Sequence, residues 1–346
     1  MHVFRVSVAM LAVLTTQLPS LAEDVTTRSL PLIPSETSVA SCGNRLVVRA
    51  GDGGVLSTDA SGRSARVGGA TGVSLVFTGN HARCLALNSA QGLLDVTGAT
   101  AKVVFEPRGT LPNSITAATQ AADDSVWIGI AGSEQVAVFA PDGSVRYFDL
   151  PHDGLGNGTL APAEPRFPPS VSATPLFASE LQSLAASPGY VWGLRTTIPA
   201  GDASPSYLIR IDPATQAYSR IVLDTNRRGA GLAALGDDSA VVLMSNDRIL
   251  VTDSARILLR WEIPGTPRYA TPPWSLNLAV PFGDGADVVS LKDGTLWHVS
   301  VPGQTIELKA RFPGRPSWLT VLSDRFAAVN SDASELMTIT FRSAMQ

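Results

Sequence analysis

Short runs of apolar residues alternate with clusters of polar turn residues along most of the chain. Within many runs, apolar and polar positions alternate with the period of two that is typical of β-strands. After the N-terminal segment, no stretch sustains the apolar period of an amphipathic helix. The pattern therefore predicts an all-β protein.

The runs form a unit that repeats about every 40 residues, the range of a propeller blade. Each unit has a strand, a tight polar turn, a second strand, a variable loop, a third strand, a turn of Gly, Asp or Pro, and a fourth strand. The second strand is the easiest to recognise, because the Asn, Asp or Gly residues before it tolerate positive φ angles. The predicted second strands are Arg45–Arg49, Arg83–Leu87, Ser125–Gly129, Tyr190–Gly193, Ala240–Leu243, Ala286–Ser290 and Arg325–Val329.

The two ends of the chain complete each other. The last unit stops after its third strand, Leu336–Phe341, and the segment Thr26–Ile33 precedes the first complete unit as a lone strand. Pairing of these two would close the ring and remove its exposed edges. We therefore expect a seven-bladed β-propeller closed by an N-terminal strand, with residues 23–346 as a single domain. Two separate β domains are the alternative, but they would not explain seven similar units.

The repeat resembles the blades of NHL, YVTN and streptogramin-lyase-like propellers, which share a WD40/YVTN-like architecture. Asp123–Gly129 followed by Pro141–Val145 is the nearest match, and Tyr190–Pro213 comes next. The resemblance covers most of the chain but concerns the blade, so it implies fold rather than activity. Streptogramin lyases are thought to use a His together with a Glu and a His that are close in sequence. No Glu-x-His occurs here, so the resemblance carries no catalytic residue over.

The N-terminus has the order of a secretory signal peptide, which we place at residues 1–22. Arg5 is followed by the apolar run Val6–Leu14 and the small-residue segment Ser20–Ala22. The run is shorter than the roughly 20 apolar residues that span a bilayer. A membrane anchor and a buried N-terminal strand are the alternatives. We expect a periplasmic or secreted protein without a transmembrane segment in the mature chain.

The net charge and the two cysteines limit which binding partners and which cross-link or metal site the sequence predicts. The net charge is −4 and no lysine run is present, so nucleic-acid binding is not expected. An exported compartment favours a disulfide between Cys42 and Cys84. Two buried unpaired thiols are an equally weighted alternative. Two cysteines alone do not make a zinc site, and the chain contains no calcium-loop pattern.

Long loops between blades carry the candidate binding residues. The largest, Leu150–Ser179, belongs with other long loops on one face of the ring, and long loops on rigid scaffolds often carry function. Several combine Pro with Arg and aromatic residues, the types enriched at interface hot spots. The candidates are Arg166, Phe167, Arg227, Arg228, Arg268, Tyr269, Trp274, Arg315 and Trp318. The alternative interpretation is that the aromatic residues cap the blades while the arginines solvate the rim.

No catalytic constellation emerges from the sequence. His81, His152 and His298 lie in different contexts, and no nucleophile elbow, phosphate loop or dinucleotide pattern is present. We therefore expect a non-enzymatic propeller, without metal or cofactor, that binds a protein segment or small ligand on its long-loop face. A lyase or lactonase-type hydrolase with its site at the channel mouth is the alternative, so enzymatic activity is left open. A quinone-linked propeller is a weaker third hypothesis.

Overall fold

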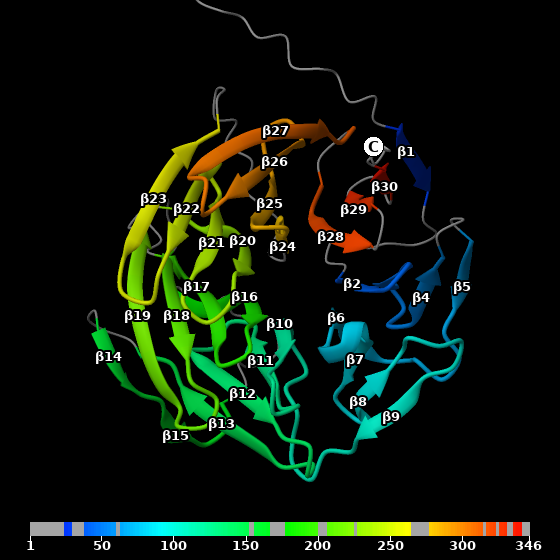
Figure 1. The fold of residues 1–346 in the computed structure, drawn as a ribbon. Helices are drawn as coiled ribbons and strands as arrows, with labels where there is room; N and C mark the ends of the chain where they lie inside the picture. Colours follow the sequence, from blue (N-terminus) through cyan, green and yellow to red (C-terminus); the bar gives the residue numbers. More distant parts are fainter. Residues whose placement is uncertain are drawn as a thin grey trace, which may run out of the picture.

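The computed structural model describes residues 24–29, 38–59, 63–151, 156–166, 177–199, 206–224, 227–263, 277–313, 316–322, 325–330 and 335–340. Its strands form seven antiparallel sheets around a central axis, as Figure 1 shows. The protein is a seven-bladed β-propeller, as the repeat predicted. Apart from one 3-10 turn at Asn80–Ala82, the regular elements in these ranges are strands. None of the described segments forms a helix long and apolar enough to cross a bilayer.

The first three blades each place four strands in chain order from the axis outward. Blade 1 contains β2 (Val39–Cys42), β3 (Arg45–Arg49), β4 (Val55–Thr58) and β5 (Ser64–Arg66). Blade 2 contains β6 (Val73–Thr78), β7 (Cys84–Asn88), β8 (Gly92–Asp95) and β9 (Lys102–Phe105). Blade 3 begins with β10 (Ile115–Gln120), β11 (Val126–Ile130), β12 (Gln135–Phe139) and β13 (Val145–Asp149).

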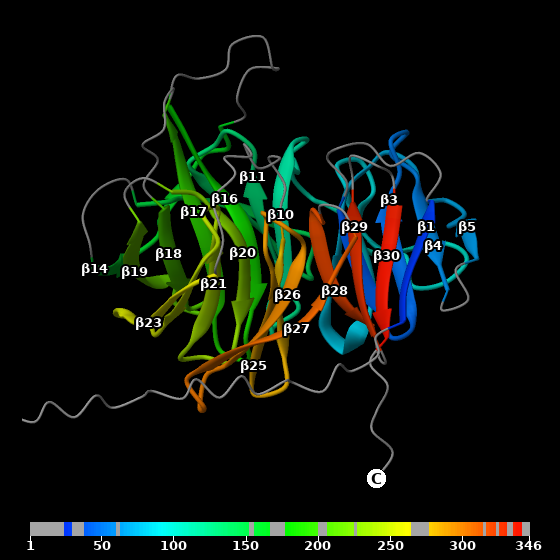
Figure 2. The ribbon, with the colours of Figure 1, turned by 90° about the horizontal axis from the view of Figure 1, so that it is seen from above.

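The next three blades repeat this order. Blade 4 contains β16 (Phe177–Ala186), β17 (Val191–Pro199), β18 (Ser206–Ile211) and β19 (Ala217–Asp224). Blade 5 contains β20 (Gly229–Ala234), β21 (Ala240–Met244), β22 (Arg248–Thr252) and β23 (Ile257–Glu262). Blade 6 contains β24 (Ala279–Phe282), β25 (Gly285–Val289), β26 (Thr295–Ser300) and β27 (Thr305–Arg311). Figure 2 shows that β16 and β17 of blade 4 rise above the neighbouring strands on one face of the ring.

Blade 7 joins the two ends of the chain and confirms the predicted closure. It contains β28 (Trp318–Leu322), β29 (Arg325–Asn330), β30 (Glu335–Thr340) and, as its outermost strand, β1 (Asp24–Ser29). β1 is antiparallel to β30, with Thr26 opposite Thr338, and the hydroxyl oxygens of these two residues lie 2.6 Å apart. The N-terminal strand thus covers an edge that would otherwise be free to pair with another chain.

The long connection between blades 3 and 4 is partly strand, which corrects the prediction of one continuous loop. Residues Gly156–Thr159 form β14 on the outer edge of blade 4, and Ala161–Ala163 form β15 on the outer edge of blade 3. Each addition makes a five-stranded sheet. The connection therefore crosses the outer rim between the two blades instead of lying wholly on the long-loop face. Turn residues in the sequence concealed this, because Gly156 and Gly158 lower the strand propensity.

The core lies between the blades. The second strands β7, β11, β21 and β25 are buried at every position because a neighbouring sheet covers each of their faces. Trp127 in β11 and Trp192 in β17 are among the largest buried side chains and fill the spaces between adjacent sheets. Because each sheet buries its apolar faces only against its neighbours, the stability of a blade depends on the closed ring.

Polar contacts also join neighbouring blades. Asp247, in the turn between β21 and β22, is buried and accepts hydrogen bonds from Ser290 Oγ at 2.9 Å and from Leu291 N at 2.8 Å. Burial raises the pKa of the Asp247 carboxyl, and these two hydrogen bonds act in the opposite direction. Asp247 therefore connects blade 5 to blade 6 on the face that carries the turns between second and third strands.

Candidate functional site

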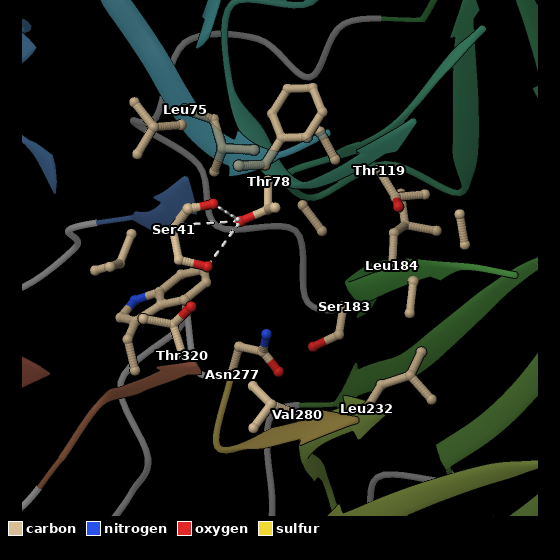
Figure 3. A pocket seen from close by; sticks show the side chains of 18 of the residues that line it. Ser41, Leu75, Thr78, Thr119, Ser183, Leu184, Leu232, Asn277, Val280 and Thr320 are labelled. Atoms are coloured by element: carbon tan, nitrogen blue, oxygen red, sulfur yellow. Dashed lines mark hydrogen bonds between the residues drawn. The ribbon is translucent and has the colours of Figure 1, made fainter. Parts of the chain in front are cut away.

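The innermost strands of the seven blades enclose a central cavity of about 400 Å³. Figure 3 shows its wall from close by. Every blade contributes residues through β2, β6, β10, β16, β20, β24 or β28. A volume of this size lies within the range of small-molecule sites, about 300–1,000 Å³. The cavity is therefore the first place to look for a ligand.

The described cavity wall is uncharged and of mixed polarity. Its hydroxyl and amide side chains are Ser41, Thr78, Asn80, Thr116, Thr119, Gln120, Gln182, Ser183, Asn277 and Thr320. Its larger apolar side chains are Val39, Leu75, Val76, Phe77, Leu184, Leu232, Val280, Trp318, Leu319 and Val321. No Asp, Glu, His, Lys or Arg occurs among these described lining residues. Such a wall can donate and accept hydrogen bonds and can cover apolar surface.

Four consecutive innermost strands carry an irregularity at the same place. The pairing with the second strand skips Ser74 in β6, Thr116 in β10, Gln182 in β16 and Ala230 in β20. A bulged residue leaves the regular alternation and can be turned toward a site. Thr116 and Gln182 line the central cavity. Thr116 Oγ1 donates to Leu181 O at 2.5 Å and so connects blade 3 to blade 4.

A donor and an acceptor on residues of the cavity wall have no partner among the described residues. Trp318 Nε1 and Asn277 Oδ1 are both buried, and neither makes a hydrogen bond within the described part of the chain. The two residues pair through a parallel β-bridge, and Leu319 N donates to Asn277 O at 2.8 Å. In Figure 3, the side chains of Asn277 and Ser183 lie close together and point toward each other. An unpaired buried polar group costs about 1–3 kcal/mol.

Blades 1 and 2 are joined beside the cavity. Thr78 Oγ1 accepts a hydrogen bond from Ser41 N at 3.0 Å and donates to Ser41 O at 3.1 Å, as Figure 3 shows. The adjacent Cys42, at the end of β2, forms a disulfide with Cys84, at the start of β7. Their Cα atoms are 5.4 Å apart, within the usual disulfide range. This part of the wall is therefore held at a fixed geometry.

The structure describes four of the nine predicted binding residues and does not bring them together. Trp318 lies in the cavity wall, whereas Arg166 is exposed on the rim and forms an ion pair with Asp149. Arg227 and Arg228 are half-buried at the start of blade 5, where their carbonyl oxygens accept hydrogen bonds from Ser206 Oγ and Ser245 N. The other five lie outside the described residues: Phe167, Arg268, Tyr269, Trp274 and Arg315.

Two buried arginines were not among the sequence candidates. Arg195 in β17 and Arg220 in β19 are 2% and 4% exposed, and both donate from Nη1 to the carbonyl oxygen of Pro151. The Tyr207 ring also lies 5.1 Å from the Arg220 guanidinium carbon, within cation–π range. Pro151 begins the connection from blade 3 to blade 4, so these arginines anchor that connection. An arginine in a predicted strand gives no signal of burial, because most strand arginines face water.

A titratable cluster lies away from the cavity, in blade 6. His298 Nδ1 is 2.5 Å from the carboxylate of the buried Asp287, and Nε2 is 2.9 Å from that of the exposed Asp284. Ser300 Oγ donates to the other Asp284 oxygen at 2.5 Å. Because the two carboxylates occupy opposite sides of the ring, they do not converge on a common point. The described residues contain no group of three or more His, Cys, Asp or Glu arranged to hold a metal ion.

The fold is similar to that of several solved structures. It is similar to a streptogramin B lyase, with a TM-score of 0.63, 13% identity and coverage of 92% of this chain and 98% of that chain. It is also similar to virginiamycin B lyase from Staphylococcus aureus, with a TM-score of 0.61, 11% identity and coverage of 92% and 100%. The computationally designed Ika8 protein matches with a TM-score of 0.51, 13% identity and coverage of 91% and 98%.

These likenesses concern the fold. At such identities a common propeller does not carry a common activity. No protein-family model matches the chain, and no curated protein matches it in sequence. The function must therefore be argued from the cavity itself.

Proposed function

We propose that this protein is an exported, non-enzymatic propeller that binds an uncharged small molecule or a short protein segment in its central cavity. The observation that carries the proposal is that Trp318 and Asn277, two bridged residues of the cavity wall, leave a donor (Trp318 Nε1) and an acceptor (Asn277 Oδ1) without partners among the described residues. An amide group complements them, because its carbonyl accepts from the indole N–H and its N–H donates to the Asn277 oxygen. The apolar wall around Leu75, Leu184 and Val280 suits aliphatic neighbours of that amide.

Export is part of the proposal. The N-terminal signal pattern at residues 1–22 supports it, and so does the disulfide between Cys42 and Cys84, because such bonds persist in oxidising compartments. We place the protein in the periplasm or outside the cell. Loop residues Arg268, Tyr269, Trp274, Phe167 and Arg315 remain candidates for contacts at the long-loop face.

The test uses uncharged N-acetyl dipeptide amides as probes and isothermal titration calorimetry as the measurement. Trp318→Phe keeps an aromatic ring but removes the N–H donor, so we expect binding to weaken about fivefold to tenfold, the value of one hydrogen bond. Trp127→Phe is the matched control, because the Trp127 indole N–H is also buried without a partner but lies between blades 3 and 4. Equal weakening in both variants, or no binding of any probe to the wild type, would contradict the proposal.

A lyase is the second candidate function, favoured by the likeness to the streptogramin B lyases. A catalytically inactive variant of the Staphylococcus aureus enzyme has been solved with quinupristin. The direct test is incubation of the purified protein with quinupristin, followed by mass spectrometry. We expect the compound to be recovered unchanged, since the described cavity wall offers no titratable side chain for proton transfer. Appearance of a product formed from quinupristin, absent from a protein-free control, would favour the lyase instead.

A further inference from the structure

A second cavity of about 410 Å³ lies on the face that carries the turns between second and third strands. It is formed where the turn between β3 and β4 meets the connections that lead into β6 and β10. Its described lining is Ser38, Arg49, Gly51, Asp52, Gly53, Gly72, Val73, Ser74, Leu75, Asn113, Ser114 and Ile115. The wall is thus mostly polar and, unlike that of the central cavity, it contains charged side chains.

Arg49 provides this pocket with a positioned cation. It is the last residue of β3, it is half-buried, and its Nε donates to Val73 O at 2.8 Å. That bond fixes the plane of the guanidinium against the pocket wall. The Nη1 and Nη2 groups make no hydrogen bond or ion pair within the described part of the chain. Two such N–H groups in one plane match the two oxygens of a carboxylate or phosphate.

The surrounding backbone is fixed before any ligand arrives. Val73 N donates to Gly53 O at 2.8 Å, and Asn88 Nδ2 donates to Thr71 O at 2.6 Å. Gly53 and Gly72 have φ angles of +75° and +65°, and a Cβ on Gly53 would lie 3.3 Å from the Gly72 Cα. Glycine adopts both positive φ angles without strain, and a Cβ at position 53 would crowd the crossing segment. A preformed pocket loses little entropy when it binds a ligand, which favours affinity.

Asp52 carries the one carboxylate among the described lining residues, and it is already neutralised. Asp52 accepts from Arg66 Nη2 at 2.7 Å and from Gly54 N at 2.9 Å. The hydrogen bond from Arg66 is the largest of the effects that lower the pKa of Asp52, so the carboxylate stays ionised and paired. Because Arg66 compensates the charge of Asp52, the positive charge of Arg49 has no counter-charge among the described lining residues. The pocket therefore favours an anion, although the net charge of the chain is negative.

Uncharged donors complete the site. Ser74 is the unpaired residue of the bulge in β6, and Asn113 and Ser114 precede β10 of the neighbouring blade. We propose that this pocket binds the oxyanion group, carboxylate or phosphate, of a small molecule through Arg49, with Ser74, Asn113 and Ser114 as further donors. The described linings of the two cavities share Leu75 but no polar side chain, so the proposal stands whether or not the central cavity binds an amide.

The experiment follows backbone amide shifts of Gly53, Gly72 and Ser114 by NMR while acetate, inorganic phosphate or acetamide is added to the full protein. Acetamide has the shape of acetate without its charge. We expect saturable shifts with at least one anion and none with acetamide. A response to acetate alone assigns the site to carboxylates, and a response to phosphate alone assigns it to phosphate groups.

Variants locate the effect at Arg49. Arg49→Gln should weaken the anion at least tenfold, and Arg49→Lys should weaken it less, because the charge remains. Arg63→Gln is the matched control, since Arg63 is exposed in blade 1 and lies outside the described lining of the pocket. Equal weakening by Arg49→Gln and Arg63→Gln, saturable shifts with acetamide, or no saturable shift with either anion would overturn the proposal. The comparison of acetate with acetamide needs only the wild type, so it tests anion binding even if a variant fails to fold.

Discussion

Asp287 and His298 lie opposite each other on β25 and β26, with the Asp287 carboxylate 2.5 Å from the imidazole Nδ1. Asp287 is 1% exposed, whereas Asp284 on the other side of the ring is in solvent. Desolvation raises the pKa of Asp287 to about 6, and the hydrogen bond with His298 opposes this rise. Glu307, paired with His298 in β27, and Lys309 are the other charged groups at this cluster.

The pH dependence of stability should report this buried carboxyl. Its pKa is higher in the folded than in the unfolded chain, so the folded state binds more protons between pH 4 and 6 and stability falls as pH rises through that window. Two pKa units correspond to about 3 kcal/mol. Relative to Asp287→Asn, the wild type should therefore lose about that much unfolding free energy between pH 4 and 7, measured by urea denaturation.

Asp284→Asn is the control for this prediction. The hydrogen bond from Ser300, followed by that from His298, lowers the pKa of Asp284. Its contribution to stability is therefore present above pH 4 and is lost only at lower pH, so this variant should follow the wild type between pH 4 and 7. A pH profile of Asp287→Asn that runs parallel to the wild type would contradict the assignment.

Removal of the Asp247 carboxylate should loosen the contact between blades 5 and 6. Asp247→Ala leaves Ser290 Oγ and Leu291 N without their acceptor, so we expect a loss of about 3 kcal/mol. Asp247→Asn should cost less than half as much, because Asn keeps an acceptor and tolerates the φ of 61° at this position. Urea denaturation measures both. Asp253→Ala, at a turn within blade 5, removes the acceptor of the hydrogen bonds that Ala255 N and Arg256 N donate, and it should cost no more than about 1 kcal/mol.

Reduction of the disulfide should destabilise the ring. Cys42 and Cys84 are 42 residues apart, and closure of a loop of this length in the unfolded chain is worth about 4 kcal/mol. Thermal unfolding with and without dithiothreitol measures the effect. The Cys42→Ala/Cys84→Ala double variant should unfold at the temperature of the reduced protein and should not respond to the reductant. A reductant effect of equal size in the double variant would show that the bond is not its cause.

Deletion of residues 24–29 should expose the edge of β30. That edge would then carry unpaired backbone groups along six residues, from Glu335 to Thr340. We expect a lower unfolding temperature and concentration-dependent association, measured by calorimetry and analytical ultracentrifugation. Replacement of Thr26 and Thr27 by Ser keeps the backbone pairing and should leave the protein monodisperse to the same extent as the wild type. A deletion variant with unchanged stability would show that β1 contributes little to closure.

The blade repeat was predictable because it depends on local chemistry. The predicted second strand Arg45–Arg49 coincides with β3, and Arg325–Val329 differs from β29 by one residue. The turns before second strands use residues suited to positive φ, such as Gly43 at 59° before β3 and Asp124 at 63° before β11. The alternation of apolar and polar residues within each strand, and the turn residues between strands, involve residues that are adjacent in sequence. The unit count and the closing strand follow from them.

The candidate site was only partly predictable. Trp318 was selected for its place in a Pro- and Arg-rich segment, yet it lies in the wall of the central cavity. Asn277, Ser183 and Arg49 were not selected, because a single Asn, Ser or Arg in a strand-like segment carries no local signal. The first strand of each predicted blade would have indicated which residues line the axis. Which of those side chains point into the cavity depends on bulges at Thr116 and Gln182.

The order of apolar and turn residues by itself determined seven antiparallel sheets and an N-terminal strand left over to complete the last one. Only the tertiary structure decided that Cys42 meets Cys84, that Asp247 reaches blade 6, and that Asn277 and Trp318 share the cavity wall. The physical reason is the separation along the sequence of the residues that make contact. Strands and turns are selected by neighbouring residues, whereas these contacts arise when separate sheets pack against each other around the closed ring.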